Sequence, residues 1–200
     1  MGGNFWSEFT GVDISGDGIA DNGTLPWNST DRILLGGDSL PLVSTGTASC
    51  GTITSSLTLS ENVSITSGTC FNITTNLVTI NCAGYSIKGT DLSNNFGIYS
   101  LGYNNITIKD CDISGFKTAI MLNGSNAVVE RNRLHNNTYG LDFYDCDNCS
   151  IRHNKAYNNS EINIYLYRGS SDNNLTNNTL YNSKYGLKIG NLANETTNAN

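Results

Sequence analysis

A repeat of 21 to 23 residues between Tyr103 and Ile189 most constrains what this chain can fold into. Four segments carry one half of the repeat, each followed two residues later by an apolar or small residue: Ile106–Cys111, Ala127–Asn132, Cys149–Asn154 and Asn173–Asn178. An apolar pair carries the other half, at Ile120/Leu122, Leu141/Phe143, Ile164/Leu166 and Leu187/Ile189. The first members of these pairs are 21, 23 and 23 residues apart, and Ile98 extends the series by 22.

Short alternating apolar runs at this period predict a solenoid whose rungs are β-strands. Alternate side chains of a strand point to opposite faces, so one face of each rung points inward. No rung can bury this face alone, and stacking on its neighbours is what makes it stable. We therefore predict an all-β fold, a single-stranded parallel β-helix of about five to six rungs with little α-helix.

Asparagine recurs at one position of three successive repeats, as Asn132, Asn154 and Asn178. Asparagines at one inward bend can hydrogen-bond along the stack as a ladder and so satisfy buried amides rung after rung. The alternative is a chance alignment in an asparagine-rich chain. We interpret the column as a ladder.

These repeats resemble the right-handed parallel β-helix repeats (PbH1 type) of the NosD-like and carbohydrate-binding/sugar-hydrolase families, which are common in archaeal and bacterial surface proteins. The segment Asn76–Gly89 resembles the entry rungs of archaeal extracellular members. The resemblance implies a right-handed coil and an extracellular or cell-surface location. It says less about activity, since this fold carries lyases, hydrolases, epimerases, tailspikes and structural proteins.

The first 45 residues are outside the repeat and resemble a cap. Gly3–Asp21 is similar to the segment that follows the last rung in NosD-like proteins, and Asp38–Leu42 is similar to the motif that closes it, with Leu40 in place of Tyr. In that family the cap follows the β-helix, whereas here it precedes one. We divide the chain into an irregular capping segment (1–45), a β-helix (46–189) and a polar tail (190–200).

An Asp/Gly-rich loop in the cap has the ligand spacing of an EF-hand. Oxygen atoms suited to Ca²⁺ fall at positions 1, 3, 5, 7 and 9 of the loop, with Gly18 at the sharp turn; they belong to Asp13, Ser15, Asp17, Ile19 (its carbonyl) and Asp21. Thr24 stands where the bidentate Glu is expected. We predict a structural Ca²⁺, with a hydrated Asp-Gly turn as the alternative.

Composition narrows the class of partner. The chain has 17 acidic and 11 basic residues and a net charge of −6, which argues against nucleic acid as a ligand. No apolar run approaches the length of a membrane span. No signal peptide is visible, so an exported protein with this sequence is expected to be a processed product or part of a longer chain.

Sequons and cysteines both point to export. Asn-X-Ser/Thr sequons predict N-linked glycans at Asn22, Asn28, Asn62, Asn72, Asn105, Asn123, Asn136, Asn148, Asn158, Asn174, Asn177 and Asn194. Six cysteines in a chain of this kind suggest disulfides and permit fifteen pairings. Stacking allows Cys50 to face Cys70, and Cys82 to face Cys111 if Thr90–Asn95 is an insertion. Cys146 and Cys149 would then close a small loop, a metal or redox pair being the alternative.

No catalytic constellation is evident. Basic residues gather on one flank, with three aspartates nearby: Arg131, Arg133, His135, Arg152, His153 and Lys155, with Asp142, Asp145 and Asp147. The two histidines fall in different columns, and Asp110 and Asp112 do not form an obvious carboxylate pair of the kind that glycosidases use. We therefore predict a protein without enzymatic activity.

The order of cap and coil suggests a filament. The last rung (Tyr185, Leu187, Ile189) would be covered by the cap strand of a neighbouring copy (Asn4, Phe5, Trp6, Phe9), a head-to-tail contact that propagates as an open polymer. The predicted function is a structural subunit of an extracellular filament or surface layer whose partner is itself. The alternative is a module that binds or processes polysaccharide, with an acidic glycan along the Arg131–Lys155 flank.

Overall fold

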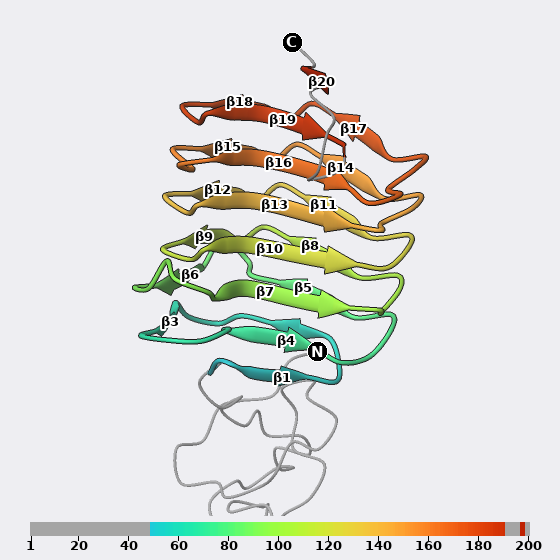
Figure 1. Cartoon of the computed structure of the whole chain (residues 1–200). Coiled ribbons are helices and arrows are strands. Elements are labelled where there is room, and N and C mark those ends of the chain that lie inside the picture. Colours follow the sequence, from blue (N-terminus) through green and yellow to red (C-terminus); the bar gives the residue numbers. More distant parts are fainter. Residues whose placement is uncertain (1–48, 191–196, 199–200) are drawn as a thin grey trace, which may run out of the picture. The chain divides into compact units, whose positions relative to one another are not determined.

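The computed structural model describes residues 49–190 and 197–198. Residues 49–190 form a stack of β-strand coils (Figure 1). Each coil passes through three parallel sheets in turn. Sheet I contains β1 (Gly51–Ile53), β4 (Phe71–Ile73), β7 (Phe96–Leu101), β10 (Thr118–Asn123), β13 (Tyr139–Tyr144), β16 (Ile162–Tyr167) and β19 (Tyr185–Ile189). The predicted boundaries of the cap lie outside the described residues.

Sheets II and III complete each coil. Sheet II contains β2 (Leu57–Thr58), β5 (Thr79–Asn81), β8 (Thr107–Lys109), β11 (Val128–Glu130), β14 (Ser150–Arg152) and β17 (Asn174–Thr176). Sheet III contains β3 (Val63–Ile65), β6 (Ser86–Gly89), β9 (Asp112–Ser114), β12 (Arg133–His135), β15 (Lys155–Tyr157) and β18 (Thr179–Tyr181). The order β1-β2-β3 then recurs, so six coils are followed by β19. The predicted all-β parallel β-helix of about six rungs is confirmed.

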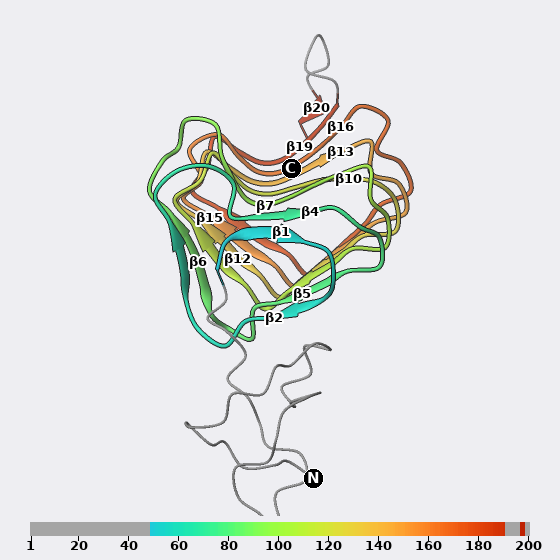
Figure 2. The same cartoon turned by 90° about the horizontal axis from the view of Figure 1, so that it is seen from below.

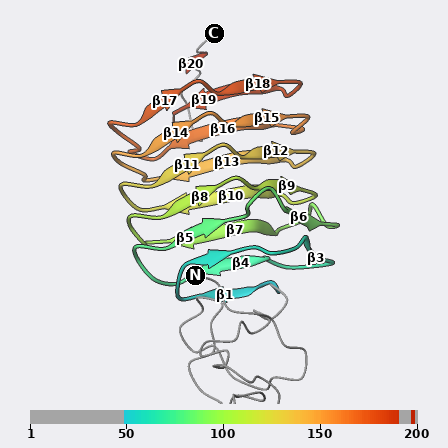
Figure 3. The same cartoon turned by 180° about the vertical axis from the view of Figure 1, so that it is seen from behind.

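The register is what the repeat predicts. Ile98 pairs with Ile120, Ile120 with Leu141, and Leu141 with Ile164 in successive strands of sheet I. These side chains are at most 1% exposed, as are Ile108 and Val129 in sheet II. Viewed along the stack, the three sheets surround the interior of the coil (Figure 2), and from behind the short strands of sheets II and III face the viewer (Figure 3). The buried apolar side chains fill this interior.

Two tight bends in each of coils three to six contain a residue with positive φ, which is most often asparagine or aspartate. Of the fifteen described non-glycine residues with positive φ, ten are Asn or Asp, the side chains that best tolerate this backbone region. The bend between sheets II and III uses Asp110, Arg131, His153 and Asn177 in this conformation, and the bend between sheets III and I uses Asn136, Asn158 and Asn182. In most of these bends the next residue is an inward-pointing asparagine.

The predicted asparagine ladder is present at the first of these bends. The side-chain oxygen of Asn154 accepts hydrogen bonds from both the backbone N–H and the side-chain amide of Asn132, each 3.0 Å long. Asn178 accepts the same pair of bonds from Asn154, at 3.0 and 3.1 Å. Cys111 occupies the equivalent position one coil before Asn132 and ends the ladder on that side, where its backbone N–H donates to the side-chain oxygen of Asn132.

A second ladder, which the sequence analysis missed, occupies the bend between sheets III and I. Asn137 donates its backbone N–H and its side-chain amide to the oxygen of Asn159, both at 3.1 Å. Below it, the N–H of Phe116 donates to Asn137, and Asn159 donates to Asn163, four residues later in β16 of the same coil. Phe116 stands one coil below this pair and Ser183 one coil above it, so only two successive repeats carry asparagine at this position, which kept the column from standing out in the sequence.

Three disulfides join Cys50 to Cys70, Cys82 to Cys111 and Cys146 to Cys149, the pairs that stacking allowed. The described residues contain no free cysteine. The second pair continues the column of the first ladder, so a covalent bond takes the place of an amide pair there. The loop Thr90–Asn95 is longer than its counterparts, as expected, but so is the bend at residues 82–85, which was not foreseen.

The polar tail contains one element that was not predicted. Its residues Thr197–Asn198 form strand β20, which pairs antiparallel with Lys188 and Ile189 of β19. The edge of β19 was expected to be open along its length, and the pairing in cis closes part of it.

The ladder predicts a large cost for a polar-to-apolar change. Asn154→Ala removes the acceptor of the Asn132 N–H and the donor to the carbonyl of Val129, leaving both groups unpaired in the interior. We expect a loss of about 2–4 kcal/mol in the free energy of unfolding, measured by urea denaturation. The control, Asn174→Ala on the exposed end of β17, should lose less than about 0.5 kcal/mol. Equal losses for the two variants would contradict the ladder's structural role.

The disulfides should differ in their effect on stability. Cys82–Cys111 closes a separation of 29 residues and Cys146–Cys149 a separation of 3, whereas all four side chains are at most 2% exposed. Each pair is replaced with serines in a separate variant. Loss of Cys82–Cys111 should lower the free energy of unfolding by about 2 kcal/mol more than loss of Cys146–Cys149, because the longer loop gains more entropy in the unfolded state. Thermal unfolding measures the difference, and a reversed order would refute the entropic explanation.

Candidate functional site

A cluster of basic side chains covers the outer faces of sheets II and III in coils two to five. We call it the basic flank; it comprises Lys88, Lys109, Arg131, Arg133, Arg152 and Lys155, together with the acidic residues Asp110, Asp112 and Glu130. Six positive and three negative charges give a local net charge of +3, in a chain whose net charge is −6. Most of the cluster predicted from the sequence is thus brought together.

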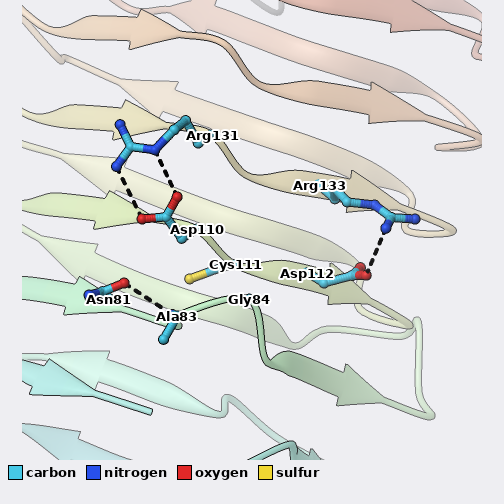
Figure 4. Close-up of a pocket in the computed structure, with 8 residues that line it drawn as sticks. All are labelled: Asn81, Ala83, Gly84, Asp110, Cys111, Asp112, Arg131 and Arg133. Carbon is cyan, nitrogen blue, oxygen red and sulfur yellow. Dashed lines mark hydrogen bonds and ion pairs between the residues drawn. The ribbon is translucent and has the colours of Figure 1, made fainter. Parts of the chain in front are cut away.

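One end of the basic flank holds its carboxylates in ion pairs. Arg131 binds Asp110 of the coil below through two nitrogens, at 2.8 and 3.1 Å, and also contacts Glu130 at 2.9 Å. Arg152 binds Glu130 from the coil above at 2.6 Å. Asp110 and Arg131 line a depression of about 540 Å³ at the bend of coils two to four (Figure 4). Its other lining residues are Asn81, Ala83, Gly84, Cys111, Asp112 and Arg133.

The ion pairs keep the carboxylates ionised. Hydrogen bonds from Arg131 lower the pKa of Asp110, against a weaker opposite effect of burial. Burial raises the pKa of Glu130, but the hydrogen bond from Arg152 and the charges of both arginines outweigh it, so the pKa falls. Neither group is therefore suited to donate a proton near neutral pH.

The centre of the basic flank combines cations with stacked aromatic rings. His135 stacks on Tyr157 and Tyr157 on Tyr181, with ring centroids 5.0 and 5.1 Å apart in successive coils. His135 also contacts Asp112 at 2.7 Å. Because the ring faces cover one another, they present mainly their edges to solvent.

Two cations of this centre remain accessible. Arg133 donates to the hydroxyl of Tyr157 at 3.1 Å and lies 3.8 Å from Asp112, yet its side chain is 58% exposed. Lys155 pairs in register with Arg133 one coil above and lies over the rings of Tyr157 and Tyr181. The two charges therefore stand side by side along the axis of the stack.

Sheet I carries a different surface on its outer side. We call it the tyrosine face; it comprises Tyr99, Tyr139, Tyr144, Tyr165, Tyr167 and Tyr185, with Asp142 among them. In register, Met121, Asp142, Tyr165 and Lys188 follow one another up one column. The sequence analysis placed Asp142 near the basic cluster, which was wrong, because β13 presents it on the opposite side of the coil from β12 and β15.

Asp142 has an unusual environment for a residue on an outward column. Burial raises its pKa from 3.8 to about 7, while a hydrogen bond from Tyr167 and the charge of Lys117 oppose the shift less strongly. Tyr165 and Tyr167 stack at 4.4 Å, and burial raises the pKa of both hydroxyls. A carboxyl that titrates near neutrality within a group of aromatic residues is a signal of function.

The sequons in the described part of the chain have accessible asparagines. The nine positions are Asn62, Asn72, Asn105, Asn123, Asn136, Asn148, Asn158, Asn174 and Asn177, and none of them is buried. The buried asparagines of the two ladders all lie outside sequons. The prediction of N-linked glycans is therefore compatible with the packing, and their occupancy stays a prediction.

Several predicted sites lie outside the described residues. They are the Ca²⁺ loop (Asp13, Ser15, Asp17, Ile19, Asp21), the cap strand (Asn4, Phe5, Trp6, Phe9) and the sequons at Asn22, Asn28 and Asn194. Within the described residues, no three His, Cys, Asp or Glu side chains are grouped as a metal site. In the same part of the chain, no helix is long and apolar enough to cross a membrane.

The top of the stack leaves apolar side chains partly uncovered. Leu175, Leu180 and Leu187 are half-buried, whereas the residues directly below them, Ile151, Ala156 and Ile164, are at most 1% exposed. Tyr185 and Ile189, both predicted interface residues, are 37% and 43% exposed.

Comparison with known proteins identifies the family. A family model described as a right-handed beta helix region matches residues 47–200. The chain belongs to the right-handed β-helix family. The narrower resemblance to NosD-like proteins, and an archaeal origin, stay predictions.

Other comparisons add little about function to this family assignment. Among solved structures, the chain is similar to the Dettilon tailspike protein (gp208), with 16% identity, a TM-score of 0.46, and coverage of 74% of this chain and 40% of the tailspike chain. A similarity of this size carries no argument about function. A search of curated proteins gave no match.

The raised pKa of Asp142 predicts a pH-dependent effect of its substitution. Below the pKa of the unfolded state, near 3.8, the carboxyl is neutral in both states; between about pH 4 and pH 7 it ionises only in the unfolded state. Stability is therefore lost as the pH rises through this range. The asparagine side chain of Asp142→Asn is neutral at every pH. The gain in the free energy of unfolding of this variant over the natural protein should therefore be larger at pH 8 than at pH 4, by on the order of 2 kcal/mol.

Urea denaturation at the two pH values measures this difference. Asp172→Asn is the matched control, because it makes the same chemical change on an exposed loop. A gain for Asp142→Asn that is the same at pH 4 and pH 8 would show that the carboxyl is not buried as described.

Proposed function

We propose that this β-helix is an extracellular protein that binds an acidic polysaccharide along the basic flank. One observation carries the proposal, the local charge of +3 in a chain of net charge −6. A positive surface on a negative protein favours association with a polyanion through long-range attraction. The three disulfides are typical of an extracellular protein.

The geometry of Arg133 and Lys155 supports an extended anionic ligand. They occupy the same register position in neighbouring coils, and parallel strands repeat at about 4.8 Å. Carboxylate or sulfate groups spaced along a linear glycan could therefore meet successive cations. Arg131 contributes charge but is already saturated by Asp110 and Glu130.

The proposal is for binding without cleavage of the chain. The carboxylates of the basic flank are each engaged with a basic residue, and the pKa values of Asp110 and Glu130 are lowered. A glycosidase needs one carboxyl with a raised pKa near the scissile bond. The carboxyl groups of Asp110 and Glu130 in the basic flank are ionised and so cannot serve as this acid.

Substitution of the two exposed cations tests the proposal. Arg133→Ala and Lys155→Ala should each weaken binding to polygalacturonate about 3- to 10-fold in isothermal titration calorimetry at low salt. Lys184→Ala changes the net charge equally, but its side chain lies beyond the basic flank, beside Glu161, and it should have little effect. Binding should also weaken as NaCl is raised.

Two results would contradict this function. One is a lack of binding to any of three polyanions: polygalacturonate, alginate and heparin. The other is equal loss of affinity for Lys184→Ala and Arg133→Ala, which would indicate attraction by net charge with no defined site.

A structural role as a filament subunit is a second candidate, supported by the partly exposed leucines of the last coil. Leu175, Leu180 and Leu187 would be buried if a second copy stacked on this end. The proposed occupant is the N-terminal cap segment of the neighbouring copy, Asn4, Phe5, Trp6 and Phe9. Because β20 pairs with part of β19, the contact would involve the edges of β17 and β18 as well.

The size of the particle in solution tests the filament. Multi-angle light scattering and negative-stain microscopy should show concentration-dependent head-to-tail polymers, which Leu180→Asp or deletion of residues 1–12 abolishes. A monomer at all concentrations would eliminate this candidate and leave the glycan proposal untouched.

A further inference from the structure

The tyrosine face contains two buried polar atoms without a partner. Among the described residues, neither the Oδ1 atom of Asp142 nor the hydroxyl of Tyr165 makes a hydrogen bond, although both are shielded from solvent. Tyr165 is only 3% exposed. An unpaired buried polar group destabilises the folded state, so such groups need an explanation.

The two atoms belong to one place on the surface. Asp142 and Tyr165 are paired in register on neighbouring strands β13 and β16, on the outward side of sheet I. Tyr167 flanks them, since it stacks on Tyr165 and donates a hydrogen bond to Asp142. The result is an acceptor on β13 and a hydroxyl-bearing ring on the neighbouring strand β16, within a group of aromatic side chains.

A cation does not suit this place. The ammonium group of Lys188 already lies 5.4 Å from the centre of the Tyr165 ring, and the charge of Lys117 also acts on Asp142. Among the described residues, no three His, Cys, Asp or Glu side chains are grouped to hold a metal ion, and Ca²⁺ needs six to eight oxygens.

An anion does not suit it either, because Asp142 is itself a carboxyl and Tyr165 offers a single hydroxyl. What the two atoms can satisfy is a neutral group that both donates and accepts a hydrogen bond. A sugar hydroxyl is such a group, and the ring's C–H surface fits against tyrosine rings, which combine an apolar body with a polar tip.

We propose that Asp142 and Tyr165, flanked by Tyr167 and Tyr144, form a site on the tyrosine face that binds an uncharged sugar residue through its hydroxyl groups. This site is separate from the basic flank, which faces away from it on sheets II and III. It takes a ligand of a different charge class and does not depend on the function proposed above.

Tyr165→Phe is the sharpest test, because it removes only the unpaired hydroxyl. The probes are dextran, laminarin and galactomannan in affinity gel electrophoresis at pH 7, with the whole chain. At least one of them should retard the natural protein, and Tyr165→Phe should weaken that interaction at least fivefold. Asp142→Asn, which replaces one of the two oxygens with a donor, should also weaken it. Tyr103→Phe, the same change in a bend away from this face, is the control and should bind as the natural protein does.

A second measurement separates loss of binding from loss of folding. Without ligand, Tyr165→Phe should leave the melting temperature unchanged or raise it, because the hydroxyl has no partner to lose. A fall of more than 3 °C would mean that the hydroxyl bonds within the protein, which overturns the proposal. So would the absence of retardation by all three polysaccharides, or an unchanged affinity for Tyr165→Phe.

The outcomes also distinguish this site from the basic flank. Binding of the neutral polysaccharide should be insensitive to NaCl up to 0.5 M and to Arg133→Ala. If polyanions fail to bind while a neutral glycan does, the flank proposal fails and this one stands. If Arg133→Ala abolishes both interactions, the site on the tyrosine face is refuted.

Discussion

The hydrogen bonds of inward asparagines at the bends are the interaction on which the rest of the structure depends. A parallel strand pairs its backbone groups with the coils above and below, but a bend turns the chain out of the ladder and leaves its N–H groups without partners. In this protein the side-chain oxygens of Asn132, Asn154 and Asn178 accept those N–H groups, and the second ladder does the same on the other side of sheet III. Coils three to six are thereby bonded to one another at their corners as well as along their strands.

Register at the corners fixes the outer surface. Equivalent bends of successive coils are hydrogen-bonded one above the other. The outward residues of successive strands therefore stand in straight columns. This brings Arg133 beside Lys155, stacks His135 on Tyr157, and places Asp142 beside Tyr165. The charges and rings themselves contribute little to stability where they are exposed. Their arrangement is a consequence of the interior, which makes the outer columns free to vary for binding.

The sequence predicted what depends on the period and missed what depends on local packing. Coil number, register, the first ladder and the pairs Cys50–Cys70 and Cys82–Cys111 all follow from residues about one repeat apart. The second ladder was missed because only two successive repeats, at Asn137 and Asn159, carry asparagine at that position. Asp142 was assigned to the wrong side of the coil. Aligning the repeats shows which residues lie above one another, but it does not show how far each bend turns the chain between two sheets. The burial of Asp142 arises from tyrosines on its own and neighbouring strands, and the sequence pattern around Asp142 does not indicate it. The arginines of the basic flank were identified from the sequence, but not their ion pairs with Asp110, Asp112 and Glu130.

Amide hydrogen exchange, measured by NMR, tests the central claim most directly. The backbone N–H groups of Cys111, Asn132 and Asn154 leave the strands at a bend, yet each donates to an asparagine oxygen of the next coil, at 3.0 Å. The account predicts that they exchange as slowly as strand amides such as that of Val129. Exchange at the rate of unprotected amides would contradict it, because the corners would then be held by something other than the asparagine ladders.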